Sequence, residues 1–290
     1  AYEIPLRLVG SEMGIRDSAC VERLKRHKSS DDIVIFLSGP TSKKTPLSIL
    51  RNRDIIAVNG SAAYLIENDI TPLIYVLTDA RFLLQRRDDF YKFSRSSRFT
   101  IVNADVYEAA TEEDKSYLRE NCLILRAFYK REKGGAVKKL KFLIKSRLHN
   151  NLLINIPWSK KGRLVGFSKD IALGYCSCHT VAYTAIQIAY SLQYSAIICS
   201  GLDLTNTCRR FYDESNNPMP SELSKDLPKI LPFFIFMRAN IPDINIFNLS
   251  DDTAISYDII PFIQPDELEK KHHTDTVSYT HLTLPTTPYV

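Results

Sequence analysis

Continuous runs of β-branched and other apolar residues recur along the chain, and each run ends in a short polar turn. A run that does not alternate between apolar and polar residues is typical of a strand buried on both faces, as in a parallel sheet. Helical patterns separate these runs. We therefore expect an α/β fold in which a Rossmann-like, mainly parallel sheet carries helices on both faces. The expected strands are residues 32–37, 54–58, 73–77, 99–103, 123–126 and 196–199, and the expected helices are residues 62–68, 81–93, 112–121, 137–148 and 180–193.

The length of 290 residues suits one large domain, and a hydrophobic content of 44% excludes a disordered chain. We expect residues 31–265 to form the α/β domain, with an N-terminal arm at 1–30 that lacks its natural start and a tail at 266–290. Residues 277–287 look like the translation of a sequencing-library adapter, so we expect no functional residue in the tail. The longest apolar run, residues 230–237, is too short for a membrane-spanning helix. The scattered cysteines and the lack of a secretory signal predict a cytoplasmic protein.

Positive charge is concentrated in the basic segment, residues 126–163, which holds twelve lysines and arginines against the single acid Glu132. Such an excess attracts an anionic partner. The candidates are nucleic acid, anionic lipid headgroups and a phosphorylated glycolipid, and a solvated helix face is the alternative interpretation. No aromatic-rich RNA-binding motif accompanies the segment, so we do not expect nucleic acid as a partner.

The polar turns after the expected strands are the places to look for a ligand, because ligands of parallel sheets bind beyond the carboxyl ends of the strands. These turns are residues 38–42, 59–61, 78–79 and 200–205. Residues 38–42 read Ser-Gly-Pro-Thr-Ser, so backbone amides and hydroxyls there can approach a phosphate or a ribose. The segment is neither a Walker A loop nor a dinucleotide-binding glycine motif, and an ordinary turn is the alternative.

Two residues near these turns are candidates for acid–base chemistry. His179 directly precedes an amphipathic helix, where Thr180 can cap free helix amides, and it is either an acid–base group or a polar packing residue. Asp203 follows the expected strand at 196–199 and hydrogen-bonds either a ligand hydroxyl or the next turn. Cys176, Cys178 and His179 are too close together to fill a zinc site, and the chain has no Asp-x-Asp motif. We therefore expect no metal.

Eight stretches of the chain are distinctive: residues 35–41, 54–60, 75–79, 85–91, 131–135, 159–166, 173–180 and 199–205. They closely resemble the lipopolysaccharide core biosynthesis proteins of the RfaZ/WaaZ family, and the resemblance covers roughly residues 30–265. It implies transfer of a third Kdo (3-deoxy-D-manno-octulosonic acid) residue from CMP-Kdo to the inner core of lipopolysaccharide. The protein would be peripheral on the cytoplasmic face of the inner membrane. No cofactor is implied beyond the CMP-Kdo donor.

A more distant likeness, to bacterial sialyltransferases that use CMP-sialic acid, implies which residues hold the donor, since both donors are CMP esters of a 2-keto sugar acid. It places donor contacts on Gly39, Pro40, Thr41, Ser42, Asn59 and Thr180, puts Gly201 and Asp203 beside the nucleotide, and loosely matches Thr205 and Tyr212 to phosphate-binding tyrosines. Ser38, Gly60 and Ser200, from the same polar turns, complete the predicted donor site. Those sialyltransferases have a catalytic histidine after the stretch that matches residues 200–203, but residues 204–271 contain no histidine. The catalytic base therefore stays open among Asp79, His179, Asp203 and Glu222.

The implied acceptor carries phosphates and Kdo carboxylates, which arginine and lysine side chains bind. We assign this role to Arg81, Arg131, Lys133, Lys138, Lys139 and Lys141. A lipopolysaccharide- or membrane-surface-binding protein without catalytic activity would need the basic segment but no donor pocket. A heptose kinase would need a phosphate-binding loop, which the sequence lacks.

Overall fold

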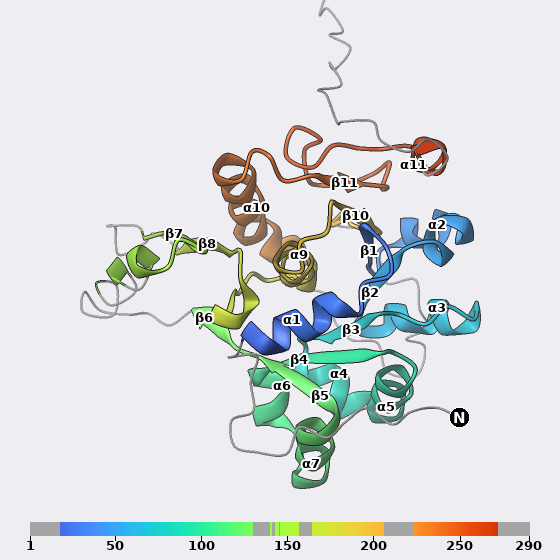
Figure 1. Cartoon of the computed structure of the whole chain (residues 1–290), viewed down its shortest axis with the longest axis vertical. Coiled ribbons are helices and arrows are strands. Elements are labelled where there is room, and N and C mark those ends of the chain that lie inside the picture. The colour runs from blue at the N-terminus through green and yellow to red at the C-terminus, as the bar shows by residue number, and fades with distance from the viewer. Residues whose placement is uncertain are drawn as a thin grey trace, which may run out of the picture.

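A seven-stranded sheet forms the centre of the molecule (Figure 1). The computed structural model describes residues 18–129, 140, 143–144, 146–156, 164–205 and 223–271. The strand order is β11, β10, β1, β2, β3, β4, β5, and every neighbouring pair is parallel. The strands are β1 (Asp32–Phe36), β2 (Asp54–Val58), β3 (Ile74–Leu77), β4 (Phe99–Asn103), β5 (Cys122–Leu125), β10 (Ala196–Ser200) and β11 (Ile246–Asn248). The predicted α/β architecture is confirmed.

The strands are apolar because both of their faces are covered. In β1, Ile33 and Ile35 belong to one hydrophobic core, while Val34 and Phe36 belong to a second core on the opposite face. Every residue of β2, β4 and β10 is buried. Such strands have no solvent-facing side and so appear in the sequence as continuous apolar runs. The six expected strands match β1 to β5 and β10 to within one residue at each end.

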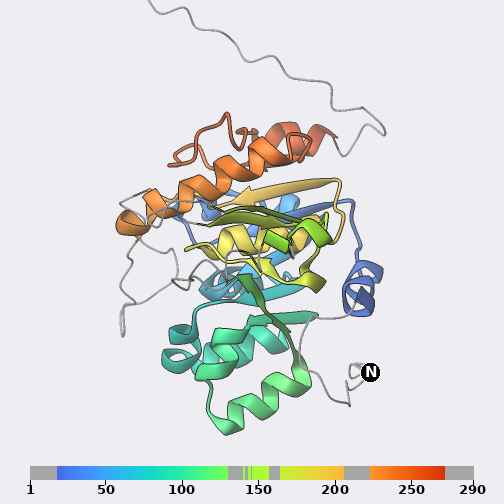
Figure 2. The ribbon, with the colours of Figure 1, turned by 90° about the vertical axis from the view of Figure 1, so that its left-hand side faces the viewer.

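Helices cover both faces of the sheet, as predicted. The face with Ile33 carries α1 (Ser18–Arg26), α9 (Val181–Ser191) and α10 (Leu223–Asn240). The face with Val34 carries α2 (Leu47–Arg51), α3 (Ala62–Glu67), α4 (Ala80–Gln85), α5 (Arg87–Arg95), α6 (Ala104–Ala109), α7 (Glu112–Asn121) and α11 (Pro265–Lys271). Figure 2 shows the long helix α10 near one end of the molecule and α7 at the other.

Two short ribbons lie beside α9. β6 (Ala127–Tyr129) pairs with β9 (Tyr175–Cys176), and β7 (Leu152–Asn155) pairs in antiparallel fashion with β8 (Val165–Ser168). Gln187, buried in α9, accepts hydrogen bonds at 2.9 Å from the backbone amides of Ser168 and Cys176. It therefore ties both ribbons to the helix. In Figure 1 the β7–β8 pair lies at the left, away from the seven-stranded sheet.

The structure corrects several expected boundaries. The single helix expected at 81–93 is two helices, α4 and α5, which meet at Arg86. Asp88 and Asp89 lie in the first turn of α5, where acidic side chains stabilise a helix start. Part of the expected arm forms α1, and α11 extends into the expected tail. Val21 of α1 and Leu268 of α11 are buried, so the packed domain reaches beyond residues 31–265 at both ends.

The elements between residues 205 and 265 were not predicted. α10 contains Pro228 and Pro232, and proline normally disfavours a helix interior. β11 has only three residues. Within the helix expected at 137–148, the described residues 140, 143–144 and 146–148 are helical. Of the helices that the structure describes, none combines the length and the apolar character that a membrane crossing requires.

Candidate functional site

The chain changes direction across the sheet at the boundary between β1 and β10. From β1 it proceeds through β2, β3 and β4 to β5 on one side, and later it places β10 and β11 on the other side. Ligands of open parallel sheets bind at such a switch point, beyond the carboxyl ends of the strands. The turn at 38–42 follows β1 and the turn at 200–205 follows β10. Both predicted turns therefore lie at the switch point.

The two turns approach each other so closely that only glycine fits between them. A Cβ atom added to Gly39 would lie 2.4 Å from the carbonyl oxygen of Gly201 and 2.5 Å from Oδ2 of Asp203. Gly201 has a φ of 75°, and a Cβ atom there would lie 1.9 Å from Oγ of Ser42. Ser42 is buried, and its hydroxyl donates to the carbonyl of Leu37 at 2.7 Å. Gly39, Ser42 and Gly201 thus shape the turns.

Asp203, in the turn after β10, connects that turn to the turns after β1 and β11. Its carboxylate accepts hydrogen bonds from the Thr41 backbone amide at 3.0 Å, from the Thr41 hydroxyl, and from the Ser250 hydroxyl at 2.6 Å. The Thr41 and Ser250 hydroxyls are themselves 2.7 Å apart. We call Thr41, Asp203 and Ser250 the switch-point cluster. Only 3% of Asp203 is exposed, so the geometry favours a residue that positions the turns over one that contacts an acceptor hydroxyl.

Asn59 is the residue that directly follows β2, beside β1 in the sheet. It has a φ of 47°, a left-handed conformation. Its side-chain Oδ1 atom is buried and has no hydrogen-bond partner within the part of the chain that the structure describes. The neighbouring Ser61 hydroxyl, by contrast, donates to the carbonyl of Phe36 at 2.7 Å. Asn59 therefore presents an acceptor at the ligand edge, while Ser61 serves the fold.

His179 and Thr180 lie at the amino end of α9. Because α9 and α10 each precede a strand of the parallel sheet, their amino ends lie at the same edge as the switch-point cluster. The Thr180 hydroxyl caps α9 by accepting from the Ala182 amide at 3.3 Å, as predicted. Nδ1 of His179 lies 3.4 Å from Oδ2 of Asp226, in the first turn of α10.

Asp226 lies between two basic side chains, His179 and Lys229. Its carboxylate pairs with Nζ of Lys229 as well as with His179. Burial alone would raise the pKa of Asp226, but the hydrogen bond from Lys229 and the charge of His179 outweigh it and lower that pKa below the usual value. The side chain of His179 is 29% exposed. His179 is therefore held by an anionic partner and is still accessible.

Asp79 and Arg81, predicted separately as a base and as an acceptor-binding residue, form one ion pair. Asp79 ends the turn after β3 and caps α4. Its two carboxylate oxygens accept from Nε and Nη2 of Arg81, at 3.0 and 2.8 Å. This bidentate pair satisfies the Asp79 carboxylate, so Asp79 is poorly placed to take a proton from a substrate.

Other predicted residues fall at the same edge or outside the described chain. Pro40 is exposed, Ser38 and Thr205 are half-buried, Gly60 is buried, and Ser200 is buried with its hydroxyl 2.8 Å from that of Thr45. Tyr212, Glu222, Arg131, Lys133, Lys138, Lys139 and Lys141 lie outside the described residues.

Sequence reasoning missed Asp226 and Ser250, together with Asn248, whose Oδ1 accepts from the Ser250 amide at 3.1 Å. No motif marks these three residues; the one available signal was a pair of polar residues at the end of the short strand β11, namely its last residue, Asn248, and Ser250 two positions later. In the described residues, no three His, Cys, Asp or Glu side chains gather as a metal site would require.

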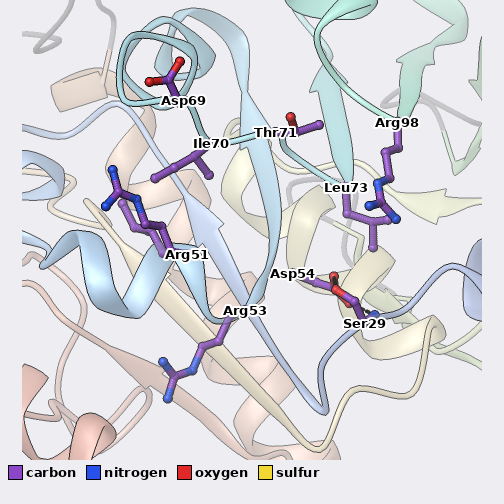
Figure 3. Close-up of a pocket in the computed structure, with 10 residues that line it drawn as sticks. Ser29, Arg51, Arg53, Asp54, Asp69, Ile70, Thr71, Leu73 and Arg98 are labelled. Carbon is purple, nitrogen blue, oxygen red and sulfur yellow. Dashed lines mark hydrogen bonds between the residues drawn. The ribbon is translucent and has the colours of Figure 1, made fainter. Parts of the chain in front are cut away.

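A separate cavity lies at the opposite edge of the sheet. It has a volume of about 230 Å³, and its lining includes Ser29, Asp54 and Leu73, which lie at the amino ends of β1, β2 and β3. Figure 3 shows Ser29 beside Asp54, with Arg53 pointing away from both. The cavity contains none of the predicted site residues. The candidate site that the sequence predicts is at the carboxyl edge.

A protein-family model described as 3-deoxy-D-manno-octulosonic acid transferase WaaZ matches residues 16–266. The chain belongs to the WaaZ family. This family match confirms the resemblance noted in the sequence and makes the chain a glycosyltransferase.

Two curated relatives of this WaaZ-family chain are both named probable 3-deoxy-manno-octulosonic acid transferase. The protein of Escherichia coli strain K12 is 68% identical over 259 residues, which cover 89% of this chain and 92% of the relative. The protein of Salmonella typhimurium strain LT2 is 65% identical over 259 residues, which cover 89% of this chain and 96% of the relative. Among solved structures, the MAf glycosyltransferase of Magnetospirillum magneticum AMB-1 has a TM-score of 0.43 and 15% identity, covering 84% of this chain and 36% of that one.

Proposed function

We propose that this protein transfers a third Kdo residue from CMP-Kdo to the inner core of lipopolysaccharide, without a metal ion. The observation that supports it best is the meeting of the glycine turns, the switch-point cluster and the amino end of α9 at one edge of the sheet. This edge is where a nucleotide donor binds in sheets of this type. Membership of a Kdo transferase family indicates that the transferred sugar is Kdo.

The donor would lie across the turn at 38–42 and the amino end of α9. Free backbone amides at the start of α9 favour the phosphate of CMP, because the amino end of a helix attracts anions. The Oδ1 atom of Asn59 is an acceptor for a donor group of the nucleotide. Asp203 would act through Thr41 and keep these turns in place, rather than touch the sugar.

The transfer breaks the bond between the anomeric carbon of Kdo and a phosphate oxygen, and the electron pair leaves with CMP. The acceptor hydroxyl oxygen forms the new bond to the anomeric carbon, and its proton passes to a base. Among the three candidate bases that the structure describes, we assign the base to His179, since Asp203 is enclosed by three hydrogen bonds and Asp79 is paired with Arg81. A partly exposed imidazole next to a carboxylate is suited to this proton transfer.

The acceptor would lie toward the basic segment. Lipopolysaccharide offers phosphates and Kdo carboxylates, and the acceptor role that we assign to Arg131, Lys133, Lys138, Lys139 and Lys141 matches these charges. Arg81 lies at the same sheet edge, and 51% of its side chain is exposed. An anionic membrane surface on the cytoplasmic side would attract the same cations.

The direct test mixes the purified full chain with CMP-Kdo, a lipopolysaccharide acceptor that carries two Kdo residues, and a metal chelator. We expect the acceptor mass to rise by one Kdo residue as an equal amount of CMP is released. An acceptor that is bound without release of CMP would instead identify a binding protein. A reaction that stops in chelator would contradict the metal-independent mechanism.

A further inference from the structure

Three large apolar side chains are exposed within one short helical stretch. The exposed fractions are 57% for Leu140, 52% for Ile144 and 72% for Leu148. The other large apolar residues that are exposed in the described chain, Leu84, Ile235 and Tyr257, lie on separate elements. Single exposed apolar residues are ordinary, whereas a group of them marks an interaction surface.

The spacing of the three residues places them on one side of the helix. The described residues 140, 143–144 and 146–148 are helical, and residues four positions apart are neighbours on a helix surface. We call Leu140, Ile144 and Leu148 the apolar stripe. Leu143 and Ser146 are half-buried, and the Ser146 hydroxyl donates to the Leu143 carbonyl at 2.9 Å. The stripe is therefore the side that the rest of the protein leaves uncovered.

Positive charge accompanies the stripe along the sequence. Lys141 follows Leu140, Lys145 follows Ile144, and the exposed Arg147 precedes Leu148. The stripe lies inside the basic segment, which holds twelve cations and one acid. A second copy of the chain would bring the same cations against each other, which opposes self-association through this face. An anionic surface with an apolar interior complements both the stripe and the charge.

We propose that the apolar stripe inserts into the interfacial region of an anionic lipid bilayer and anchors the enzyme at its lipid acceptor. This proposal rests on the proposed function in one respect: the acceptor is taken to be a membrane lipid. It goes beyond attraction between charges, because an inserted side chain contributes apolar burial that salt does not screen. Surface attraction alone is largely lost at about 1 M salt, where screening acts over about 3 Å.

The test compares a triple variant, Leu140→Ser, Ile144→Ser and Leu148→Ser, with the wild-type full chain. Binding is measured by co-sedimentation with vesicles of phosphatidylglycerol and phosphatidylethanolamine, and insertion by the pressure rise of a phosphatidylglycerol monolayer. We expect the wild type to retain binding at about 1 M salt and the triple variant to bind roughly 100-fold more weakly. The matched control, Leu84→Ser with Ile235→Ser, removes two equally exposed apolar residues elsewhere and should bind as the wild type does.

Wild-type vesicle binding by the triple variant would overturn the proposal. So would a wild-type dimer that the triple variant converts to monomer with no change in vesicle binding. If the triple variant fails to fold, Leu148→Ser alone still weakens binding and Leu148→Trp strengthens it, because Leu148 is the most exposed of the three. Transfer to an acceptor without acyl chains should be equal in the wild type and the variant. A wild type that inserts but never transfers Kdo would refute the proposed function and leave the anchor standing.

Discussion

Asp203 and Asp54 lie at opposite edges of the same sheet, and both are almost fully buried, with exposed fractions of 3% and 5%. Asp54 begins β2 and accepts hydrogen bonds from the Ser29 amide at 2.8 Å and from the Tyr194 hydroxyl at 2.8 Å. Asp203 follows β10 and accepts from Thr41 and Ser250, which lie in the turns after two other strands. Asp54 thus holds together the segments that enter the sheet at its amino edge, whereas Asp203 holds together the turns at the carboxyl edge.

Left-handed backbone conformations distinguish the two edges in the same way. Asp69 and Gln193 have φ angles of 57° and 58° and directly follow the C-caps of α3 and α9, where such a residue is an ordinary helix ending. Asn59 and Leu204 have φ angles of 47° and 50° and follow strands instead. A non-glycine residue held in this conformation costs about 1–3 kcal/mol and is typical of functional sites. Buried polar groups thus stabilise both edges, and the carboxyl edge differs in that its left-handed residues follow strands instead of ending helices.

The largest effect that we expect is on turnover, from loss of the base at the ligand edge. His179→Ala should lower kcat for Kdo transfer by about 10²- to 10⁴-fold, which is the usual contribution of general acid–base catalysis. CMP affinity should stay near wild type, because a group used in the transition state lowers kcat more than binding. Steady-state kinetics and a CMP titration on the same preparation separate the two.

Asp226→Asn tests whether the carboxylate positions His179. We expect kcat to fall about tenfold with little change in KM, and the acidic limb of the pH profile to move to lower pH, because a protonated imidazole loses its anionic partner. Lys229→Gln is the matched control, since Lys229 pairs with Asp226 and not with His179 in the described contacts. Equal losses in both variants would show that the pair only stabilises α10.

The smallest effect is expected at the amino edge and on stability alone. Burial, together with the hydrogen bond and charge of Asp54, raises the pKa of Tyr194 well above its ordinary value. Above about pH 10 the unfolded chain releases this proton and the folded chain keeps it, so stability falls as the pH rises. Tyr194→Phe should lower the free energy of unfolding by about 1 kcal/mol at neutral pH and flatten the alkaline decline. Urea unfolding across pH measures the free energy of unfolding at neutral pH and its alkaline decline. A loss of Kdo transfer in this variant would contradict a purely structural role for the amino edge.

The sheet could be predicted from sequence because β1, β2, β4 and β10 are buried on both faces and carry that burial in their composition. The position of the turns at one edge could be predicted as well, because parallel strands all end at the same edge of the sheet. The partners of the candidate residues could not be predicted, since Asp226 and Ser250 come from α10 and the turn after β11. α10 contains two prolines, which argue against a helix in the sequence, and β11 is only three residues long. Such long-range hydrogen bonds leave no local pattern.

Calorimetric titration of CMP, in the presence of chelator, into the wild type, Asp203→Asn and Asp54→Asn tests the central claim most directly. Each variant disrupts the hydrogen bonds of one buried carboxylate, at opposite edges of one sheet, so both should unfold at lower temperature than the wild type. We expect Asp54→Asn to bind CMP with wild-type affinity and Asp203→Asn to bind at least about tenfold more weakly, a difference of about 1.4 kcal/mol. Wild-type CMP affinity in Asp203→Asn, or a selective loss in Asp54→Asn, would contradict a donor site at the carboxyl edge.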